Sequence, residues 1–436
     1  SFKASQIVMQ LPDVYKVVFV VDRKDLDYQT MTDFNAFKKD RVDVTDNTQS
    51  LVRQLTDNTK LVLTTIQKLN NAVSERFAGK IEPLRHKKIV FIFDECHRSQ
   101  FGETHERITK FFEKSQLIGF TGTPIFAENA SKNDLGKRTT KDLFGNCLHK
   151  YVIIDAIRDQ NVLRFGIEYV GKHKNRSNAF IDIEVEEIDK QEVLNSEKRI
   201  NKIVDYIIAY HDQKTFNEEY SALLAVCSID NVMQYYDLFQ KKKEAGEHDL
   251  RIATIFTYGS NEDSDEAKDS LPEEEEFDWA AEPKATYKSS HSRDKLESYI
   301  GDYNTMYGTS YTTKDSESFQ KYFQSISRRL KDREKESFNN EKDRLDIVIV
   351  VNMMLTGFDA KKVNTLYVEK NLKQHGLIQA FSRTNRILGE QKSQGNILSF
   401  RNLKKATDDA ITLFSNKEAI EVATMPDYES IAEKFD

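Results

Sequence analysis

The sequence predicts an α/β protein with two tandem parallel β-sheets, each flanked by helices. Its 436 residues exceed what one compact core usually holds, so two domains are expected. Short apolar runs recur along the chain and are separated by amphipathic, helix-like stretches, which is typical of β-α-β units. Several of these runs end directly in acidic, hydroxyl or glycine residues, as strands do where a parallel sheet forms a binding site at its carboxyl edge.

The first domain is expected to span residues 1–150. It contains four apolar runs with the length and composition of buried parallel strands, and a helix is expected at residues 24–37. The expected strands are 17–21, 61–65, 89–93 and 117–120.

The second domain is expected to span residues 151–408. A polar segment rich in serine, tyrosine and charge, near residues 260–324, is interpreted as an insertion, and residues 409–436 are interpreted as the start of a helical region. The expected strands of this domain are 163–169, 222–226, 251–256, 347–351, 364–369 and 396–400.

Composition favours a soluble, cytoplasmic protein. Hydrophobic residues make up 39% and charged residues 31%, which suits buried cores inside a charged surface. No apolar run approaches the roughly 20 residues that a membrane span needs, and the start Ser1-Phe2-Lys3-Ala4 lacks the apolar region of a secretory signal. Three widely spaced cysteines indicate reduced thiols rather than a disulfide framework or a metal knuckle.

The net charge of −7 is dominated by one acidic segment. Between Glu262 and Glu282 there are eleven acidic residues and a single base, Lys268. The remainder of the chain therefore carries +3, which permits a basic groove for nucleic acid without requiring one. The simplest interpretation of the segment is a solvated loop or short helix, and a docking site for a partner is the alternative.

The most informative motif is Asp94-Glu95-Cys96-His97, which follows the apolar run Ile89–Phe93 directly. Adjacent carboxylates at the end of a buried strand are how α/β nucleotide hydrolases place a magnesium-directing Asp and a water-orienting Glu. Taken alone, the pair could equally cap the next helix.

Three further motifs strengthen the nucleotide hypothesis. A second apolar run ends in Thr121-Gly122-Thr123-Pro124, and a third leads to Thr356-Gly357-Phe358-Asp359. In the segment 379–386, Arg383 and Arg386 are three residues apart, so they share one helix face and could both reach a phosphate.

In this order, the motifs resemble the motor (R) subunit of type I restriction endonucleases, within the superfamily 2 helicase and translocase group. The resemblance covers nearly the whole chain and implies two RecA-like domains, the first without its Walker A strand and loop. The blocks that carry it are 21–26, 64–70, 93–102, 120–126, 357–360 and 379–386.

The resemblance implies ATP and Mg²⁺ as cofactors. Asp94 would hold Mg²⁺ through water, and Glu95 would orient or deprotonate the water that attacks the γ-phosphate. Arg383 and Arg386 would act as arginine fingers. The remaining candidates for the nucleotide site are Thr121, Gly122, Thr123, His97, Gly357, Asp359 and Gln379. Among them, the Thr121–Thr123 hydroxyls would bond the Asp94 and Glu95 carboxylates, and His97 would sense the same contact.

The resemblance also implies double-stranded DNA as a partner, together with the methyltransferase and specificity subunits of a restriction complex. Hydroxyl, amide and cationic side chains can hold a DNA backbone without reading bases. The alternative is that these side chains are only solvated. The DNA-binding candidates are Arg23, Lys24, Thr65, Gln67, Lys68 and Ser228.

One departure from the family pattern is the absence of a Gly-x-x-x-x-Gly-Lys-Ser/Thr motif from these 436 residues. Since Ser1–Ser5 resembles the helix that follows such a loop, we expect a two-domain fragment that lacks the nuclease domain and hydrolyses ATP poorly by itself. Two alternatives stay open at this point: a superfamily 2 helicase of another kind, acting on DNA or RNA, and a non-catalytic nucleic-acid clamp.

Overall fold

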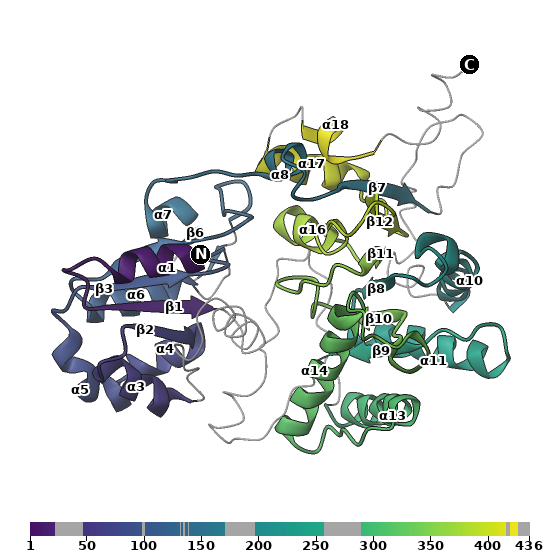
Figure 1. The fold of residues 1–436 in the computed structure, drawn as a ribbon, viewed down its shortest axis with the longest axis horizontal. Helices are drawn as coiled ribbons and strands as arrows, with labels where there is room; N and C mark the ends of the chain where they lie inside the picture. The colour runs from purple at the N-terminus through teal and green to yellow at the C-terminus, as the bar shows by residue number, and fades with distance from the viewer. Residues whose placement is uncertain are drawn as a thin grey trace. The chain divides into compact units, whose positions relative to one another are not determined.

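The computed structural model describes residues 1–21, 47–97, 101–130, 132–133, 136–137, 139–170, 197–256, 289–415 and 419–425. These residues form two compact units, Ser1–Lys150 and the residues from Tyr151 onward (Figure 1). None of the helices in the described ranges is long and apolar enough to cross a lipid bilayer.

The first unit is built on a four-stranded parallel sheet with the order β2-β1-β3-β4. Its strands are β1 (Lys16–Val21), β2 (Leu61–Thr65), β3 (Ile89–Phe93) and β4 (Gln116–Gly119). The other elements are α1 (Phe2–Met9), α3 (Thr48–Thr56), α4 (Ile66–Ala72), α5 (Glu75–Ile81), η1 (Glu82–Leu84), α6 (Phe101–Phe111), the short strands β5 (Lys132–Asn133) and β6 (Gly136–Lys137), and α7 (Thr140–Phe144).

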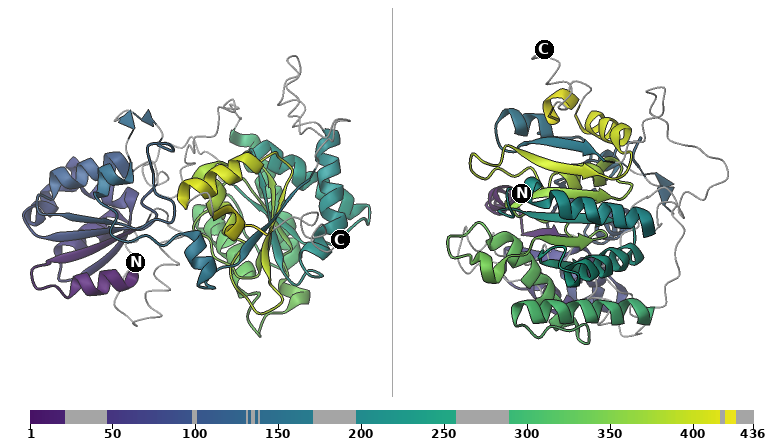
Figure 2. Two further views of the ribbon diagram at one scale, coloured as in Figure 1. Left: turned by 90° about the horizontal axis from the view of Figure 1, so that it is seen from above. Right: turned by 90° about the vertical axis from the view of Figure 1, so that its right-hand side faces the viewer.

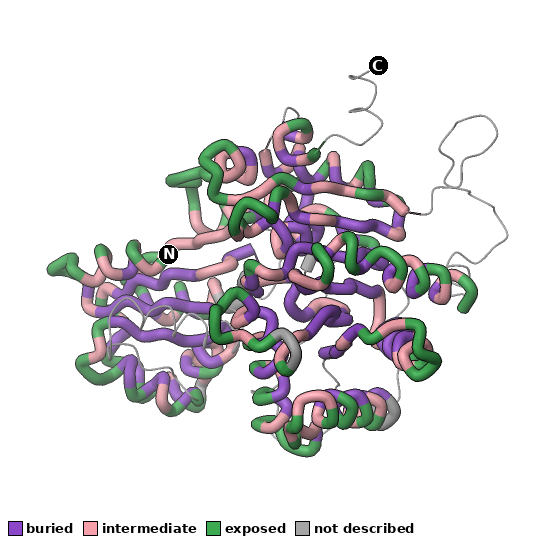
Figure 3. The backbone as a smooth tube through the Cα atoms, turned by 45° about the vertical axis from the view of Figure 1, so that its right-hand side comes forward, coloured by how far each residue is buried: buried purple, intermediate pink, exposed green. Residues whose placement is uncertain are grey.

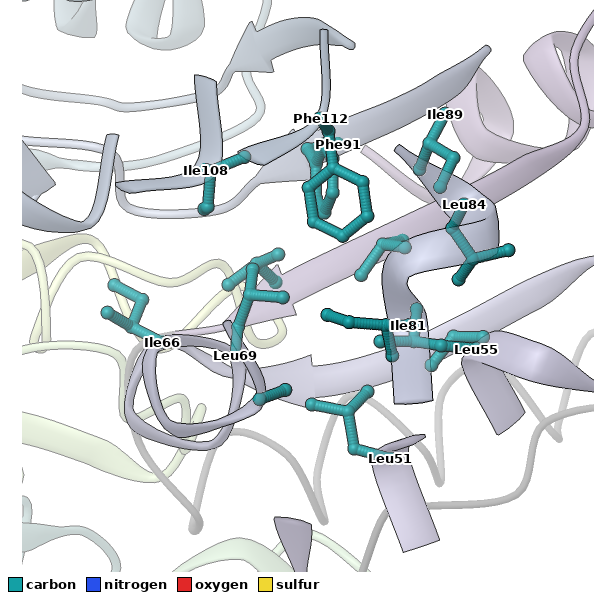
Figure 4. Packing of buried hydrophobic residues seen from close by; sticks show 14 of the residues in the cluster. Leu51, Leu55, Ile66, Leu69, Ile81, Leu84, Ile89, Phe91, Ile108 and Phe112 are labelled. Atoms are coloured by element: carbon teal, nitrogen blue, oxygen red, sulfur yellow. The ribbon is translucent and has the colours of Figure 1, made fainter. Parts of the chain in front are cut away.

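Every residue of β1, β2 and β3 is buried, because helices cover both faces of this sheet. Alternate residues supply two separate apolar clusters. Phe91 of β3 faces one cluster with Leu51, Leu69 and Phe112 (Figure 4), whereas Phe19 of β1 faces a second cluster, against which α1 packs.

The second unit is built on a six-stranded parallel sheet with the order β7-β12-β11-β8-β10-β9. Its strands are β7 (Arg164–Tyr169), β8 (Ser221–Val226), β9 (Ile252–Ile255), β10 (Ile347–Val350), β11 (Val363–Glu369) and β12 (Gln394–Ser399). Its helices are α8 (Ile153–Arg158), α10 (Glu197–Lys214), α11 (Ile229–Glu244), α13 (Ser289–Tyr307), α14 (Ser316–Asp332), α15 (Asn340–Asp343), α16 (Gln374–Phe381), α17 (Lys404–Phe414) and α18 (Ala419–Ala423).

Helices lie on both faces of this sheet (Figure 2), and the central strands are buried along their whole length (Figure 3). The predicted fold class, two tandem parallel sheets flanked by helices, is confirmed. Each expected strand forms, and its observed ends lie within two residues of the predicted ones. The helix expected at residues 24–37 and the acidic segment 262–282 lie outside the described residues.

Helices α13 and α14 were not anticipated from the polar composition of residues 260–324. They supply a cluster of buried tyrosines to the second unit. The rings of Tyr303 and Tyr322 meet edge to face at 5.0 Å, and the Tyr322 hydroxyl donates a hydrogen bond to the carbonyl of Thr254 on β9 at 2.7 Å. The described part of this segment, from residue 289, is therefore packed against the sheet.

Candidate functional site

Asp94 and Glu95 lie at the carboxyl edge of the first sheet. The amide of Asp94 donates to the carbonyl of Val20 on β1 at 3.0 Å, so strand pairing continues one residue beyond β3. Glu95 then adopts a φ of +51°, a left-handed conformation that a non-glycine residue rarely takes without support from its surroundings. The chain thus leaves the sheet at Glu95, and both carboxylates are half-buried.

The setting of Asp94 suits a cation. Burial raises the pKa of its carboxyl group, an effect opposed by a hydrogen bond from the backbone of Glu95. Among the described residues, no group of three or more His, Cys, Asp or Glu side chains could hold a metal ion. A lone carboxylate fits Mg²⁺, which keeps several waters and takes further oxygens from substrate phosphates.

His97 links the end of β3 to the end of β4. Its side chain is buried, and its Nδ1 lies 2.8 Å from the Thr121 hydroxyl and 3.5 Å from Oε2 of Glu95. The Thr121 hydroxyl in turn accepts a hydrogen bond from the amide of Thr123 at 3.0 Å. His97 therefore stands between Thr121 and Glu95 and connects the two motifs. The bonds expected from the Thr121 and Thr123 hydroxyls to the Asp94 and Glu95 carboxylates stay a prediction.

Cys96 packs beneath this motif. Its amide donates to the carbonyl of Phe120 at 3.0 Å. Burial, followed by the negative charges of Glu95 and Asp94, raises the pKa of its thiol to about 12, so it stays protonated. A Cβ added at Gly119 would lie 2.6 Å from the Cys96 sulfur. Gly119 thus belongs to the site, although sequence analysis did not single it out.

In the second unit, the predicted residues gather around the loop that joins β10 to β11. Gly357 has a φ of +69°, which glycine adopts without strain. Arg383 Nε donates to the carbonyl of Gln379 at 3.0 Å, and its Nη1 donates to the carbonyl of Phe358. Arg386 pairs with Asp359, with Nε 2.9 Å from Oδ1. Five predicted side chains or backbone positions are thus brought together: Gly357, Asp359, Gln379, Arg383 and Arg386.

Two of the DNA-binding candidates act as helix caps. The Thr65 hydroxyl accepts from the amide of Lys68 at 3.3 Å at the start of α4, and the Ser228 hydroxyl accepts from the amide of Asn231 at 3.2 Å at the start of α11. Thr65 and Lys68 are buried, whereas Gln67 and Ser228 are half-buried. Arg23 and Lys24 lie outside the described residues, and the DNA contacts stay a prediction.

The sequence of this chain is similar to known protein families and proteins. Residues 1–199 match the SWI2/SNF2 ATPase model, and residues 218–402 match the model of type I restriction enzyme subunit R domain 3. The type I restriction enzyme SauCOLORF180P endonuclease subunit of Staphylococcus aureus (strain COL) is 45% identical over all of this chain and 44% of its own length. Along its whole length, the chain is thus similar to the endonuclease (R) subunits of type I restriction enzymes. The R-subunit resemblance is thereby confirmed.

A second relative of this R-subunit family gives the same picture. The SsaAORF53P endonuclease subunit of Staphylococcus saprophyticus is 44% identical over all of this chain and 44% of its own length. The chain therefore spans less than half the length of these curated relatives.

A solved structure supports the fold of this chain. The structure of the ATP-dependent type ISP restriction-modification enzyme LlaBIII bound to DNA aligns with a TM-score of 0.51 at 13% identity, over 92% of this chain and 25% of that one. At this identity the likeness concerns the fold, and it agrees with the two RecA-like domains expected from the sequence.

Proposed function

We propose that this chain is part of an ATP-dependent translocase of double-stranded DNA, within the R subunit of a cytoplasmic type I restriction enzyme. The parent enzyme would couple ATP hydrolysis to movement of DNA before it cleaves that DNA. Methyltransferase and specificity subunits would be its partners. The observation that carries the proposal is the linked Glu95, His97 and Thr121 side chains, next to Asp94, at the carboxyl edge of the first sheet.

In the first unit, each side chain has a separate role. MgATP, when bound, supplies the transferable phosphoryl group and the cation that screens its charge. Asp94 would bind the hydrated cation, because its half-buried carboxylate gains from a positive charge. Glu95 would accept a proton from the attacking water on Oε2, and His97 holds that carboxylate beside Thr121.

In the second unit, Arg386 would stabilise charge on the transferring group, while Arg383 holds the β10–β11 loop through the carbonyl of Phe358. Arg386 forms an ion pair with Asp359, and the two side chains are 40% and 43% exposed. Such an exposed pair is held weakly, so Arg386 can exchange Asp359 for a phosphate. Gly357 allows the backbone of the loop to approach the nucleotide closely.

The double-stranded DNA would be held through its phosphates by the hydroxyl, amide and cationic side chains that the sequence analysis named. This contact would carry no sequence information, since backbone contacts position a protein without reading bases. Recognition of a site would then belong to the partner subunits.

The first experiment measures DNA-stimulated ATP hydrolysis by the complete gene product that carries this sequence. Glu95→Gln should lower kcat by about 100-fold or more, because it removes the proton acceptor while keeping the shape of the side chain. Glu113→Gln is the matched control, since Glu113 lies in the same unit and makes exposed ion pairs with Arg85 and His86, away from the motif. Full activity in Glu95→Gln would overturn the assignment.

A second experiment separates translocation from unwinding. A third DNA strand, bound as a triplex downstream of the loading site, should be displaced in an ATP-dependent manner by the wild-type protein and not by Glu95→Gln. Separation of the two duplex strands without triplex displacement would instead favour a helicase.

A further inference from the structure

We propose that Lys370 and Lys392 are positioning residues that clamp the two ends of the β10–β11 loop and so hold the Asp359–Arg386 pair in place. The inference rests on the proposed function, because it concerns the loop that carries Asp359, the partner of the proposed arginine finger Arg386. The loop spans residues 351–362, and sequence analysis singled out neither lysine.

Lys370 holds the start of the loop. It follows β11 directly, and its side chain is only 3% exposed. Its Nζ donates to the carbonyl of Val351 at 3.0 Å and to Oδ1 of Asn352 at 2.6 Å. Because Val351 and Asn352 are the first two residues after β10, this ammonium group fixes the direction in which the chain leaves the strand.

Lys392 holds the end of the loop. It is 1% exposed, and its Nζ donates to the carbonyl of Lys361 at 2.6 Å and to that of Val363 at 3.0 Å. An ammonium group is costly to bury, so it stays only where carbonyl or carboxylate oxygens compensate.

The charges around Lys392 tie it to the candidate site. Burial lowers the pKa of Lys392 to about 7, the nearby Asp359 opposes this shift, and Arg386 and Lys362 add to it. Lys392 therefore lies within electrostatic reach of both members of the Asp359–Arg386 pair, which a purely local support for the backbone would not require.

The middle of the loop has a backbone that needs such support. Met354, a residue with a side chain, has a φ of +64°, and Gly357 has a φ of +69°. Non-glycine residues persist in this conformation only where their surroundings enforce it. Arg383 donates to the carbonyl of Phe358 at the centre of the loop, so cationic side chains hold the loop at its start, its middle and its end.

The test compares two buried lysines with the same local chemistry. Lys392→Met keeps most of the side-chain volume and removes the donor. Lys16→Met is the matched control, because Lys16 is also 1% exposed and its Nζ donates to the carbonyls of Gln54 at 2.5 Å and Asp57 at 3.0 Å, in the first unit.

In the complete gene product, Lys392→Met should lower kcat of the DNA-stimulated ATPase about tenfold or more, because a misplaced group weakens only the transition state. KM for ATP should change by less than about twofold. Amides of residues 352–363 should exchange faster with deuterium in Lys392→Met than in wild type, and should be unchanged in Lys16→Met. Lys392→Arg should restore part of kcat, since its guanidinium can still donate to both carbonyls.

Each outcome decides between explanations. The clamp would be overturned if Lys392→Met and Lys16→Met changed kcat equally and deuterium exchange of residues 352–363 stayed as in wild type. A wild-type protein without ATPase activity, or a fully active Glu95→Gln, would instead overturn the proposed function. The faster loop exchange in Lys392→Met would still be measurable in that case, so the two failures are distinguishable.

Discussion

Gly119→Ala should disturb the Asp94–His97 motif at the end of β3, because the added methyl group would collide with Cys96. The new Cβ would lie 2.6 Å from the Cys96 sulfur and 3.0 Å from the ring of Phe144, whereas ordinary contacts are 3.4–4 Å. Cys96 is 2% exposed within the first apolar cluster and its amide is tied to the carbonyl of Phe120, so relieving the contact should also shift the backbone of the residues on either side of it. Those residues are Glu95 and His97.

Gly119→Ala should lower the free energy of unfolding of this unit by about 1–3 kcal/mol, as in other overpacked cores. Gly79→Ala is the matched control, because nothing lies within 4 Å of a Cβ added there, in the middle of α5. It should be stabilising by roughly 0.5–1 kcal/mol, since alanine is the better helix former. Cys96→Ala removes the sulfur, so Gly119→Ala should cost about 1 kcal/mol less in a Cys96→Ala background.

The measurement is hydrogen exchange of the β3 and β4 amides in the complete gene product, which reports opening of this unit without assuming two-state unfolding. The ATPase rate of Gly119→Ala should fall as well, because Glu95 is displaced. The reasoning fails if the β3 and β4 amides exchange at the same rate in Gly119→Ala as in Gly79→Ala. It also fails if Cys96→Ala does not slow this exchange in the Gly119→Ala background.

Two further predictions concern the second unit. Because burial lowers the pKa of Lys392 from 10.5 to about 7, the folded protein binds fewer protons than the unfolded chain between these values, so its stability should rise with pH across this window. The melting temperature, measured as a function of pH, should rise across this window in wild type and not in Lys392→Met. Parallel curves of melting temperature against pH for the two proteins would contradict the prediction. Ser228→Ala removes the acceptor for the amide of Asn231 and should cost about 1 kcal/mol, whereas Ser228→Asp should keep the cap. If Ser228 contacts a DNA phosphate, Ser228→Asp should weaken DNA binding at unchanged stability, and equal affinities in a salt titration would remove it from the interface.

The strands could be predicted because buried parallel strands are continuous apolar runs, and β2 and β3 have the predicted ends. Helices α13 and α14 could not, because their buried Leu, Ile, Phe and Tyr residues are scattered among polar ones, and tyrosine also suits a polar surface. Asp94 and Glu95 follow β3 directly, so their place at the carboxyl edge was predictable. The roles of Lys370 and Lys392 could not be predicted, since lysines are rarely buried and the sequence does not show which carbonyls accept their hydrogen bonds.

The two arginines of the 379–386 segment, which the sequence treats alike, should separate in function. Arg383 is committed to the loop through the carbonyl of Phe358, and leaving it would break a charge-assisted hydrogen bond. Arg386 loses only an exposed pair with Asp359, worth about 1 kcal/mol or less. We therefore expect Arg386 to be the finger that meets the phosphate and Arg383 to hold the loop.

Substitution by lysine distinguishes these roles. Arg386→Lys should lower kcat about tenfold or more without changing deuterium exchange in residues 352–363, because a point charge cannot reproduce the planar guanidinium. Arg383→Lys should instead increase exchange in that loop, with loss of kcat as a consequence. If Arg386→Lys loosened the loop while Arg383→Lys left it protected, the two roles would have to be exchanged.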